Sequence, residues 1–262
     1  NWKKGMANAN RTIGVNYSYG KSDYQGSLEY YLKGLKLFEE LGDKGGTAKI
    51  LSNIGVVYWY QSDYPKALKY LFDALKIDEE TGNKDGIAGT LSNIGIVYNS
   101  QENYPKALEY MLKANKIDEA AGNKSGIASN LGNIGELYRR LSDLDKALEY
   151  DLKALHLYEE LGNKNGIARN LGNIGAIYTE KRNYADALEY YEKALKVDEE
   201  GSEDVYYKLG WLYNDLEKYD DAIKILMKAI QVNSENSGYR EELGFAYYKK
   251  EQYEFAITQL NK

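Results

Sequence analysis

The sequence contains no cysteine, a single histidine and only two prolines among its 262 residues. Without cysteine the protein has neither disulfides nor thiolate metal sites. One histidine, His156, argues against a zinc site built from imidazoles, because such a site uses several of them. No apolar run is long enough to cross a membrane, and the first residues lack a signal-peptide pattern. The compartment stays open, with the cytoplasm favoured.

The composition also excludes several functions. The net charge is −6, and an acidic balance argues against a general nucleic-acid binder, whose affinity depends on neutralising phosphates. No glycine-rich phosphate loop and no pair of nucleophile and base is evident. The acidic runs Asp78–Glu80 and Asp198–Glu200 are interpreted as solvated helix ends. We therefore expect no catalytic residues, no metal site and no cofactor, and predict that the chain is not an enzyme.

A five-residue element returns about every forty residues. Its four copies are Leu51-Ser52-Asn53-Ile54-Gly55, Leu91-Ser92-Asn93-Ile94-Gly95, Leu131-Gly132-Asn133-Ile134-Gly135 and Leu171-Gly172-Asn173-Ile174-Gly175. A fixed period in this range is the signature of a stacked repeat architecture.

Residues 83–122 illustrate one repeat. Gly82 can take the left-handed conformation that ends a helix, and Asn83 can cap the next one. Apolar residues then follow from Ile87 to Tyr98 at three- and four-residue spacing, which predicts an amphipathic helix. Asn103 is a second candidate cap, and Pro105 falls in the first turn of a second helix. The repeat is therefore predicted to be a helix-turn-helix.

Small and aromatic residues recur at fixed places in each repeat. In residues 83–122 they are Gly95, Tyr98, Tyr104, Ala107 and Ala114. This pattern resembles the tetratricopeptide repeat family over nearly the whole chain. Successive glycines of the Gly95 type are 41 residues apart, then 40 three times, then 35 and 34. The earlier repeats are thus similar to the lengthened ones of kinesin light chain, spindle-orientation adaptors and bacterial signalling proteins.

This resemblance implies an all-α fold, a right-handed superhelical solenoid of helix-turn-helix units. We expect one solenoid over residues 1–262, with a change of curvature near Gly201 where the repeat shortens. The seven expected units are residues 1–42, 43–82, 83–122, 123–162, 163–202, 203–236 and an incomplete 237–262. Both ends lie inside the pattern, so we expect the sequence to be a fragment of a larger protein.

The repeated asparagine is the main candidate for function. In the tetratricopeptide fold the first helix of each unit lines the inside of the superhelix, so Asn53, Asn93, Asn133 and Asn173 are expected to form a ladder along a groove. An amide offers both donors and an acceptor, and can pair with the backbone of an extended peptide. Related adaptors use an asparagine in this way, so the resemblance implies the same here. The alternative is that each asparagine bonds to the neighbouring unit and fixes the stacking.

The ladder is expected only in the central units, because Thr12, Lys208 and Glu242 replace the asparagine elsewhere. The residues beside the ladder are small, which would let a ligand backbone come close. These neighbours are Ser52, Ser92, Gly132 and Gly172.

Other groove residues suggest what the ligand contains. Exposed aromatic and aliphatic residues are common anchors, and arginines favour carboxylates. The expected contacts are Trp59, Tyr60 and Ile96 in the second and third units, and Arg139, Arg140 and Arg169 in the fourth and fifth. A peptide with apolar and acidic residues would match them. The alternative for the arginines is salt bridging with Glu136 and Glu180.

Asp151 is unusual because it occupies the partly buried place of Leu71, Met111 and Tyr191 in other units. It either pairs with a groove residue or is a tolerated defect.

We therefore predict a protein-interaction module that binds an extended peptide segment of a protein partner, without nucleic acid or membrane insertion. The alternatives are a self-associating scaffold, joined through exposed apolar residues such as Trp2, Phe255 and Leu260, or a sensory segment of a larger signalling protein.

Overall fold

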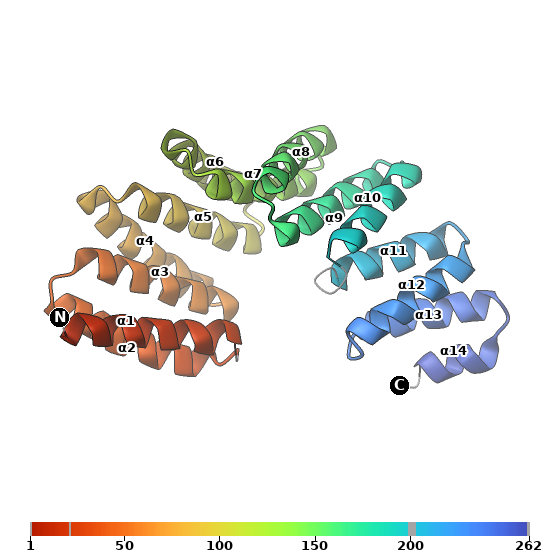
Figure 1. Ribbon diagram of the computed structural model, residues 1–262, viewed down its shortest axis with the longest axis horizontal. Coiled ribbons are helices and arrows are strands. Elements are labelled where there is room, and N and C mark those ends of the chain that lie inside the picture. The colour runs from red at the N-terminus through yellow and green to blue at the C-terminus, as the bar shows by residue number, and fades with distance from the viewer. Residues whose placement is uncertain (1, 21, 199–202, 261–262) are drawn as a thin grey trace. The chain divides into compact units, whose positions relative to one another are not determined.

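The computed structural model describes residues 2–20, 22–198 and 203–260. Over these residues the chain forms fourteen α-helices and one π-helical segment, with no strand (Figure 1). The contacts divide the chain into two compact units, residues 1–137 and 138–262. An all-α array of paired helices was expected, and this prediction is confirmed.

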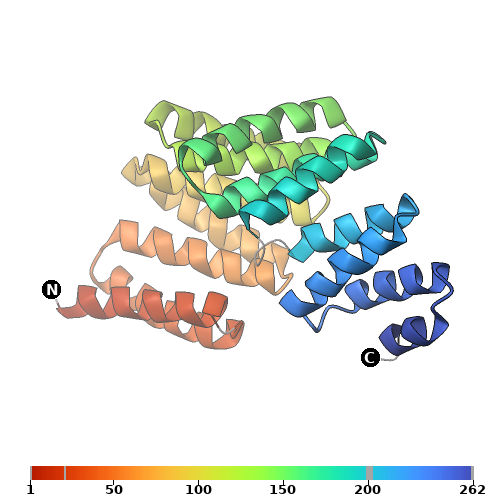
Figure 2. The same cartoon turned by 45° about the vertical axis from the view of Figure 1, so that its right-hand side comes forward.

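In the first unit, consecutive helices pack as antiparallel pairs, as α3 and α4 show from both directions (Figures 1 and 2). The elements are α1 (Trp2–Val15), the π-helical segment η1 (Asn16–Gly20), α2 (Tyr24–Glu40), α3 (Lys44–Tyr60), α4 (Tyr64–Thr81), α5 (Lys84–Ser100), α6 (Tyr104–Ala121) and α7 (Lys124–Arg140), whose last residues belong to the second unit.

The second unit continues with shorter helices toward its end. They are α8 (Leu144–Glu160), α9 (Lys164–Glu180), α10 (Tyr184–Val197), α11 (Glu203–Asp215), α12 (Tyr219–Val232), α13 (Ser237–Lys249) and α14 (Tyr253–Leu260).

Local sequence determines where these helices begin and end. Gly82 ends α4 in the left-handed conformation, at φ 68°, and the Asn83 side chain caps α5 by accepting from the Gly86 amide. Asn103 caps α6 in the same way, with a proline in the first turn. Both predicted caps are confirmed. The turn from the first helix to the second in each pair instead uses a non-glycine residue at positive φ, such as Glu102 at 58°.

The packing glycines bring paired helices close together. A Cβ on Gly95 would lie 2.7 Å from Cγ of Met111 and 3.2 Å from the carbonyl oxygen of Ala107. Beside this contact, Leu91, Ile94 and Val97 of α5 are buried in one cluster with α4 and α6 residues. Each fully buried side chain of this size contributes about 2 kcal/mol to the stability of the fold. The core consists of local clusters, because each repeat packs only against its neighbours.

Three predictions about the architecture have different outcomes. The division into seven units and the right-handed superhelix stay predictions. The expected change of curvature near Gly201 lies outside the described residues. Between α1 and α2, the segment Asn16–Gly20 is π-helical. This local widening follows α1 in the most diverged repeat.

Candidate functional site

The candidate site lies on the first helix of each pair, on a stripe beside the core-facing residues. On α5 the buried stripe includes Leu91 and Ile94, while Asn93 and Ile96 are half-buried next to it. Asn53 on α3 and Asn133 on α7 have the same half-buried setting, as does Asn173 on α9 in the second unit. We call these four residues the asparagine positions.

In the first unit the asparagine positions differ in their bonding. Nδ2 of Asn93 donates to Oγ of Ser52 over 3.3 Å, a long hydrogen bond to the preceding repeat. Asn53 and Asn133 make no side-chain hydrogen bond within the described residues. Asn93 thus takes part in stacking, whereas Asn53 and Asn133 keep their amide groups available.

The predicted aromatic anchors form a rigid cluster. Nε1 of Trp59 donates to Oγ of Ser100 over 2.7 Å, which fixes the indole. Its ring lies 4.7 Å from that of Tyr60, and Tyr60 stacks on Tyr24 at 5.5 Å. Tyr60 keeps 39% of its surface exposed, whereas Ile96 on the next first helix is half-buried. The cluster therefore joins α2, α3 and α5 and presents one exposed ring.

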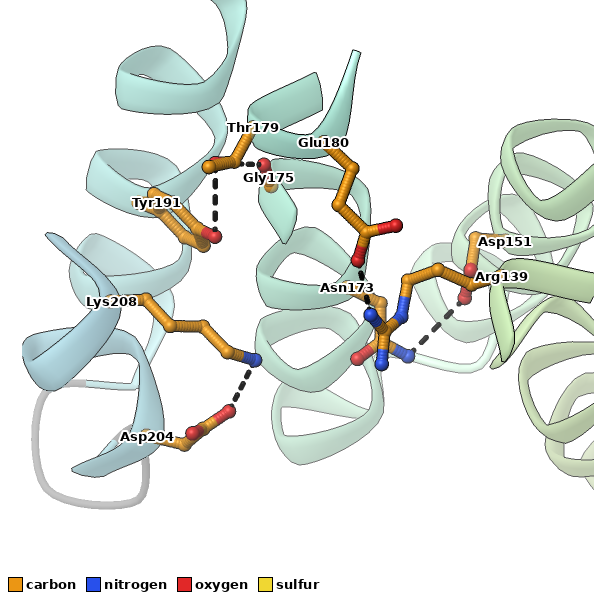
Figure 3. A network of polar contacts seen from close by, with 9 residues as sticks. All are labelled: Arg139, Asp151, Asn173, Gly175, Thr179, Glu180, Tyr191, Asp204 and Lys208. Carbon is orange, nitrogen blue, oxygen red and sulfur yellow. Dashed lines mark hydrogen bonds and ion pairs between the residues drawn. The ribbon is translucent and has the colours of Figure 1, made fainter. Parts of the chain in front are cut away.

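In the second unit, Asn173 is held by a buried acid (Figure 3). Asp151 has no exposed surface, and its Oδ1 accepts from Nδ2 of Asn170 at 3.1 Å and from Nδ2 of Asn173 at 3.4 Å. Asn170 also donates to the backbone carbonyl of Asp151 over 3.1 Å. The unusual aspartate therefore pairs with two asparagines of α9.

The three predicted arginines are in different surroundings. Arg139 forms an ion pair with Glu180, so the salt-bridge alternative describes this residue (Figure 3). Arg169 is exposed and donates to the Tyr158 hydroxyl over 2.9 Å. Arg140 is exposed at the end of α7. Arg169 is therefore better placed than Arg139 to meet an external carboxylate.

A small pocket of about 160 Å³ lies beside Asn173. It is lined by charges of both signs, including Arg169, Asp198 and Asp204, and by the apolar Val205. Asp204 is also 2.5 Å from the ammonium of Lys208 on the same helix (Figure 3). A Cβ on Gly172 would approach Cγ2 of Val205 to 2.9 Å. Gly172, the small residue before Asn173, thus lets α11 pack closely against α9.

The structure also contains buried polar groups that the repeat pattern did not predict. Nδ2 of Asn130 donates to Oδ2 of Asp118 over 2.9 Å, and Oγ of Ser92 donates to Oδ1 of Asn130 over 2.7 Å. The sequence does hold a signal for these linked hydrogen bonds. The core-facing position of Asn130 changes from apolar to polar between repeats. Its occupants are Ile50, Thr90, Asn130 and Asn170.

The interpretation of Asp78–Glu80 as a wholly solvated run was wrong for its first residue. Asp78 is only 3% exposed, and burial raises the pKa of its carboxyl. Nδ2 of Asn83 donates to its Oδ1 over 2.7 Å, which partly opposes this shift. The misreading arose because the acid occupies the place of Phe38 and Tyr158, on the inner side of the helix end. His156, by contrast, is exposed as expected.

No group of three or more His, Cys, Asp or Glu residues within the described parts of the chain could hold a metal ion. No helix of these parts is long and apolar enough to cross a membrane.

The chain was then compared with known proteins. Among the solved structures that share its fold is apo RapI (18% identity, TM-score 0.71, covering 97% of this chain and 95% of that one). Another is BtubC (BKLC) from P. vanneervenii (17% identity, TM-score 0.66, covering 88% of this chain and 90% of that one). A third is a signal transduction ATPase (STAND) protein with a tetratricopeptide repeat sensor from Pyrococcus horikoshii (16% identity, TM-score 0.79, covering 97% of this chain and 41% of that one). At these identities the likeness concerns the fold alone. No curated protein matches the sequence.

Family models give the assignment. A model described as anaphase-promoting complex, cyclosome, subunit 3 matches residues 180–262. The model described as tetratricopeptide repeat matches four overlapping ranges, 5–80, 47–120, 86–160 and 126–200. Such repeats generally mediate protein–protein interactions and are usually non-catalytic. Since these ranges together span most of the sequence, the chain belongs to the tetratricopeptide repeat family.

Proposed function

We propose that the chain binds an extended peptide segment of a partner protein through Asn53, Asn93 and Asn133 of its first unit. The observation that carries this proposal is that Asn53 and Asn133 hold half-buried amides without a side-chain hydrogen bond in the described residues. A polar group in such a place gains about 1 kcal/mol from each hydrogen bond that a ligand supplies. An amide can both donate to and accept from one peptide unit, so backbone recognition suits it.

Neighbouring residues set the preferred side chains of the peptide. In the first unit, the exposed ring of Tyr60 and the half-buried Ile96 favour apolar residues. The indole of Trp59 is already oriented by Ser100, so little side-chain entropy is lost on binding. On the second unit, taken by itself, the exposed Arg140 and Arg169 favour acidic residues. Neither a cofactor nor a metal is required.

The test begins with peptides selected from a random library, whose affinities are measured by fluorescence anisotropy. The double variant Asn53→Ala/Asn133→Ala should bind at least about tenfold more weakly, since two hydrogen bonds are lost. Its melting temperature should stay nearly unchanged, because neither side chain bonds within the described residues. Asn8→Ala is the matched control, as this exposed amide bonds only to its own helix.

A second set of peptides tests backbone recognition directly. Methylation of the peptide nitrogens that face the asparagines should weaken binding without changing any side chain. If the Ala variants bind as tightly as the parent chain, the proposal is wrong. If they lose stability and binding together, the asparagines serve the stacking of the repeats instead.

Self-association is the alternative that a specific observation favours. Trp2 is 82% exposed, Phe255 59% and Leu260 61%. Exposed apolar residues of this size can pair between copies. Sedimentation equilibrium of the same samples separates the two ideas, because a scaffold would dimerise without peptide.

A further inference from the structure

A cleft of about 430 Å³ lies in the second unit, between α11, the start of α12 and α13. Its lining combines carboxylates with large aromatic rings: Asp215, Glu217, Glu241, Glu242, Trp211 and Phe245. Glu242 takes the place that asparagine holds in the central repeats, and Trp211 takes that of Ile96. The same helix stripe thus carries a different chemistry in the shorter repeats.

The charge of the cleft is strongly negative. Four carboxylates face one ammonium group, that of Lys249. Asp215, Glu217 and Glu241 form no ion pair within the described residues. The Lys249 ammonium instead lies 5.4 Å from the ring centre of Phe245, over its face. One ring of the cleft therefore already accepts a cation.

Trp211 and Phe245 leave large parts of their rings open to solvent. Their exposed fractions are 41% and 44%. An indole face attracts a cation through its ring quadrupole, and nearby carboxylates add their charge attraction.

A buried amide at the wall of the cleft adds an independent observation. Asn214 is only 5% exposed, and its Nδ2 donates to Oε2 of Glu242 over 2.8 Å and to the Glu242 backbone carbonyl over 3.0 Å. These two bonds fix which way the amide faces. Its Oδ1 has no hydrogen-bond donor within the described residues. A buried acceptor without a donor costs about 1–3 kcal/mol, and the two bonds to Glu242 hold the amide in place despite that cost.

We propose that this cleft receives the guanidinium group of an arginine side chain from a protein partner. A guanidinium is planar, so it can stack on an indole, and it carries five N–H donors for carboxylates. It also stays charged at all working pH values. A lysine ammonium matches the charge but neither the planarity nor the number of donors. The cleft shares no residue with the asparagine positions, so either proposal can fail without the other.

The experiment uses the whole chain and three blocked tripeptides, acetyl-Gly-X-Gly-amide, in which X is arginine, citrulline or lysine. Citrulline keeps the planar shape but has no charge. Binding is followed by NMR through the indole N–H signals of Trp2, Trp59 and Trp211, assigned with Trp211→Phe. The arginine peptide should shift the Trp211 signal while leaving the other two in place. Citrulline and lysine should each bind at least about tenfold more weakly.

A pair of variants tests the carboxylates. Glu217→Gln/Glu241→Gln alters two exposed side chains, so the fold should be kept, and the arginine peptide should lose at least about tenfold in affinity. Glu254→Gln on α14 is the matched control and should bind as the parent chain does. Equal binding of arginine and citrulline would overturn the proposal, as would equal binding of arginine and lysine. Arginine binding that survives the double substitution would also overturn it.

Discussion

The long repeats near the middle of the chain and the short repeats at its end are built on the same contacts but with different helix lengths. In the long repeat α5 has 17 residues and α6 has 18, whereas α13 has 13 and α12 has 14. Each helix of the short repeat has therefore lost about one turn. The packing glycine of the first helix is kept in both, as Gly95 and Gly210.

Their surfaces differ more than their cores. The first helices of the long repeats present neutral amides, with an aromatic cluster at Trp59. The short repeats present carboxylates around Trp211. The helix-pair contacts therefore constrain only one stripe of each helix. The neighbouring stripe is free to take up a different binding chemistry in each repeat.

The largest expected effect tests the shared scaffold. Gly95→Val should clash with Met111 and the carbonyl of Ala107, and Gly210→Val should clash with Leu226, whose Cδ2 would lie 2.5 Å from the first added carbon. Overpacking of this kind costs about 3 kcal/mol. Hydrogen exchange, measured helix by helix, should show a similar loss of protection in α5–α6 for the first variant and in α11–α12 for the second.

Gly89→Ala is the control for this pair. Gly89 lies in the same helix as Gly95, but a Cβ there would meet nothing within 4 Å. The substitution should stabilise α5 by up to about 1 kcal/mol through helix propensity. If Gly210→Val proves harmless while Gly95→Val does not, the two kinds of repeat do not share one packing scheme.

Much of the scaffold could be predicted from sequence because its signals are local. Gly82 and Asn103 mark helix ends through backbone geometry and a single cap bond, so neighbouring residues suffice to find them. The burial of Asp78 and the pairing of Asp151 with Asn170 could not be found this way. They depend on which side chain of the next helix faces the acid, and identical repeat positions carry different partners.

The second effect, of intermediate size, tests that buried polar pairing in the long repeats. Asn170→Ile should destabilise the chain by about 2–3 kcal/mol, because Asp151 loses the Asn170 donor while staying buried. The double variant Asp151→Leu/Asn170→Ile installs the apolar residues found in other repeats. It should recover most of that loss, since a buried polar pair contributes little net stability over well-packed apolar residues.

Urea unfolding of the parent chain, both single variants and the double variant gives four free energies of unfolding. Together they form a double-mutant cycle for Asp151 and Asn170. Asp151→Leu alone should be mild, because Asn170 keeps its bond to the backbone carbonyl at position 151. A double variant as unstable as Asn170→Ile would mean that the two side chains are not coupled.

The smallest effect concerns how the second helix of each repeat ends. In the long repeat Gly82 ends α4 at φ 68°, and a Cβ there would meet no atom within 4 Å. Gly82→Ala should therefore cost about 1 kcal/mol, all of it from backbone conformation.

In the short repeat α12 ends at Asn233 with φ −139°, an extended conformation that any residue adopts. Asn233→Ala should lose the local bond from the Glu235 amide to its side chain without any change of backbone strain, at a cost of a few tenths of a kcal/mol. Thermal melting followed by circular dichroism should thus show a larger decrease for Gly82→Ala than for Asn233→Ala. Equal decreases would show that the left-handed glycine does not distinguish the long repeat from the short one.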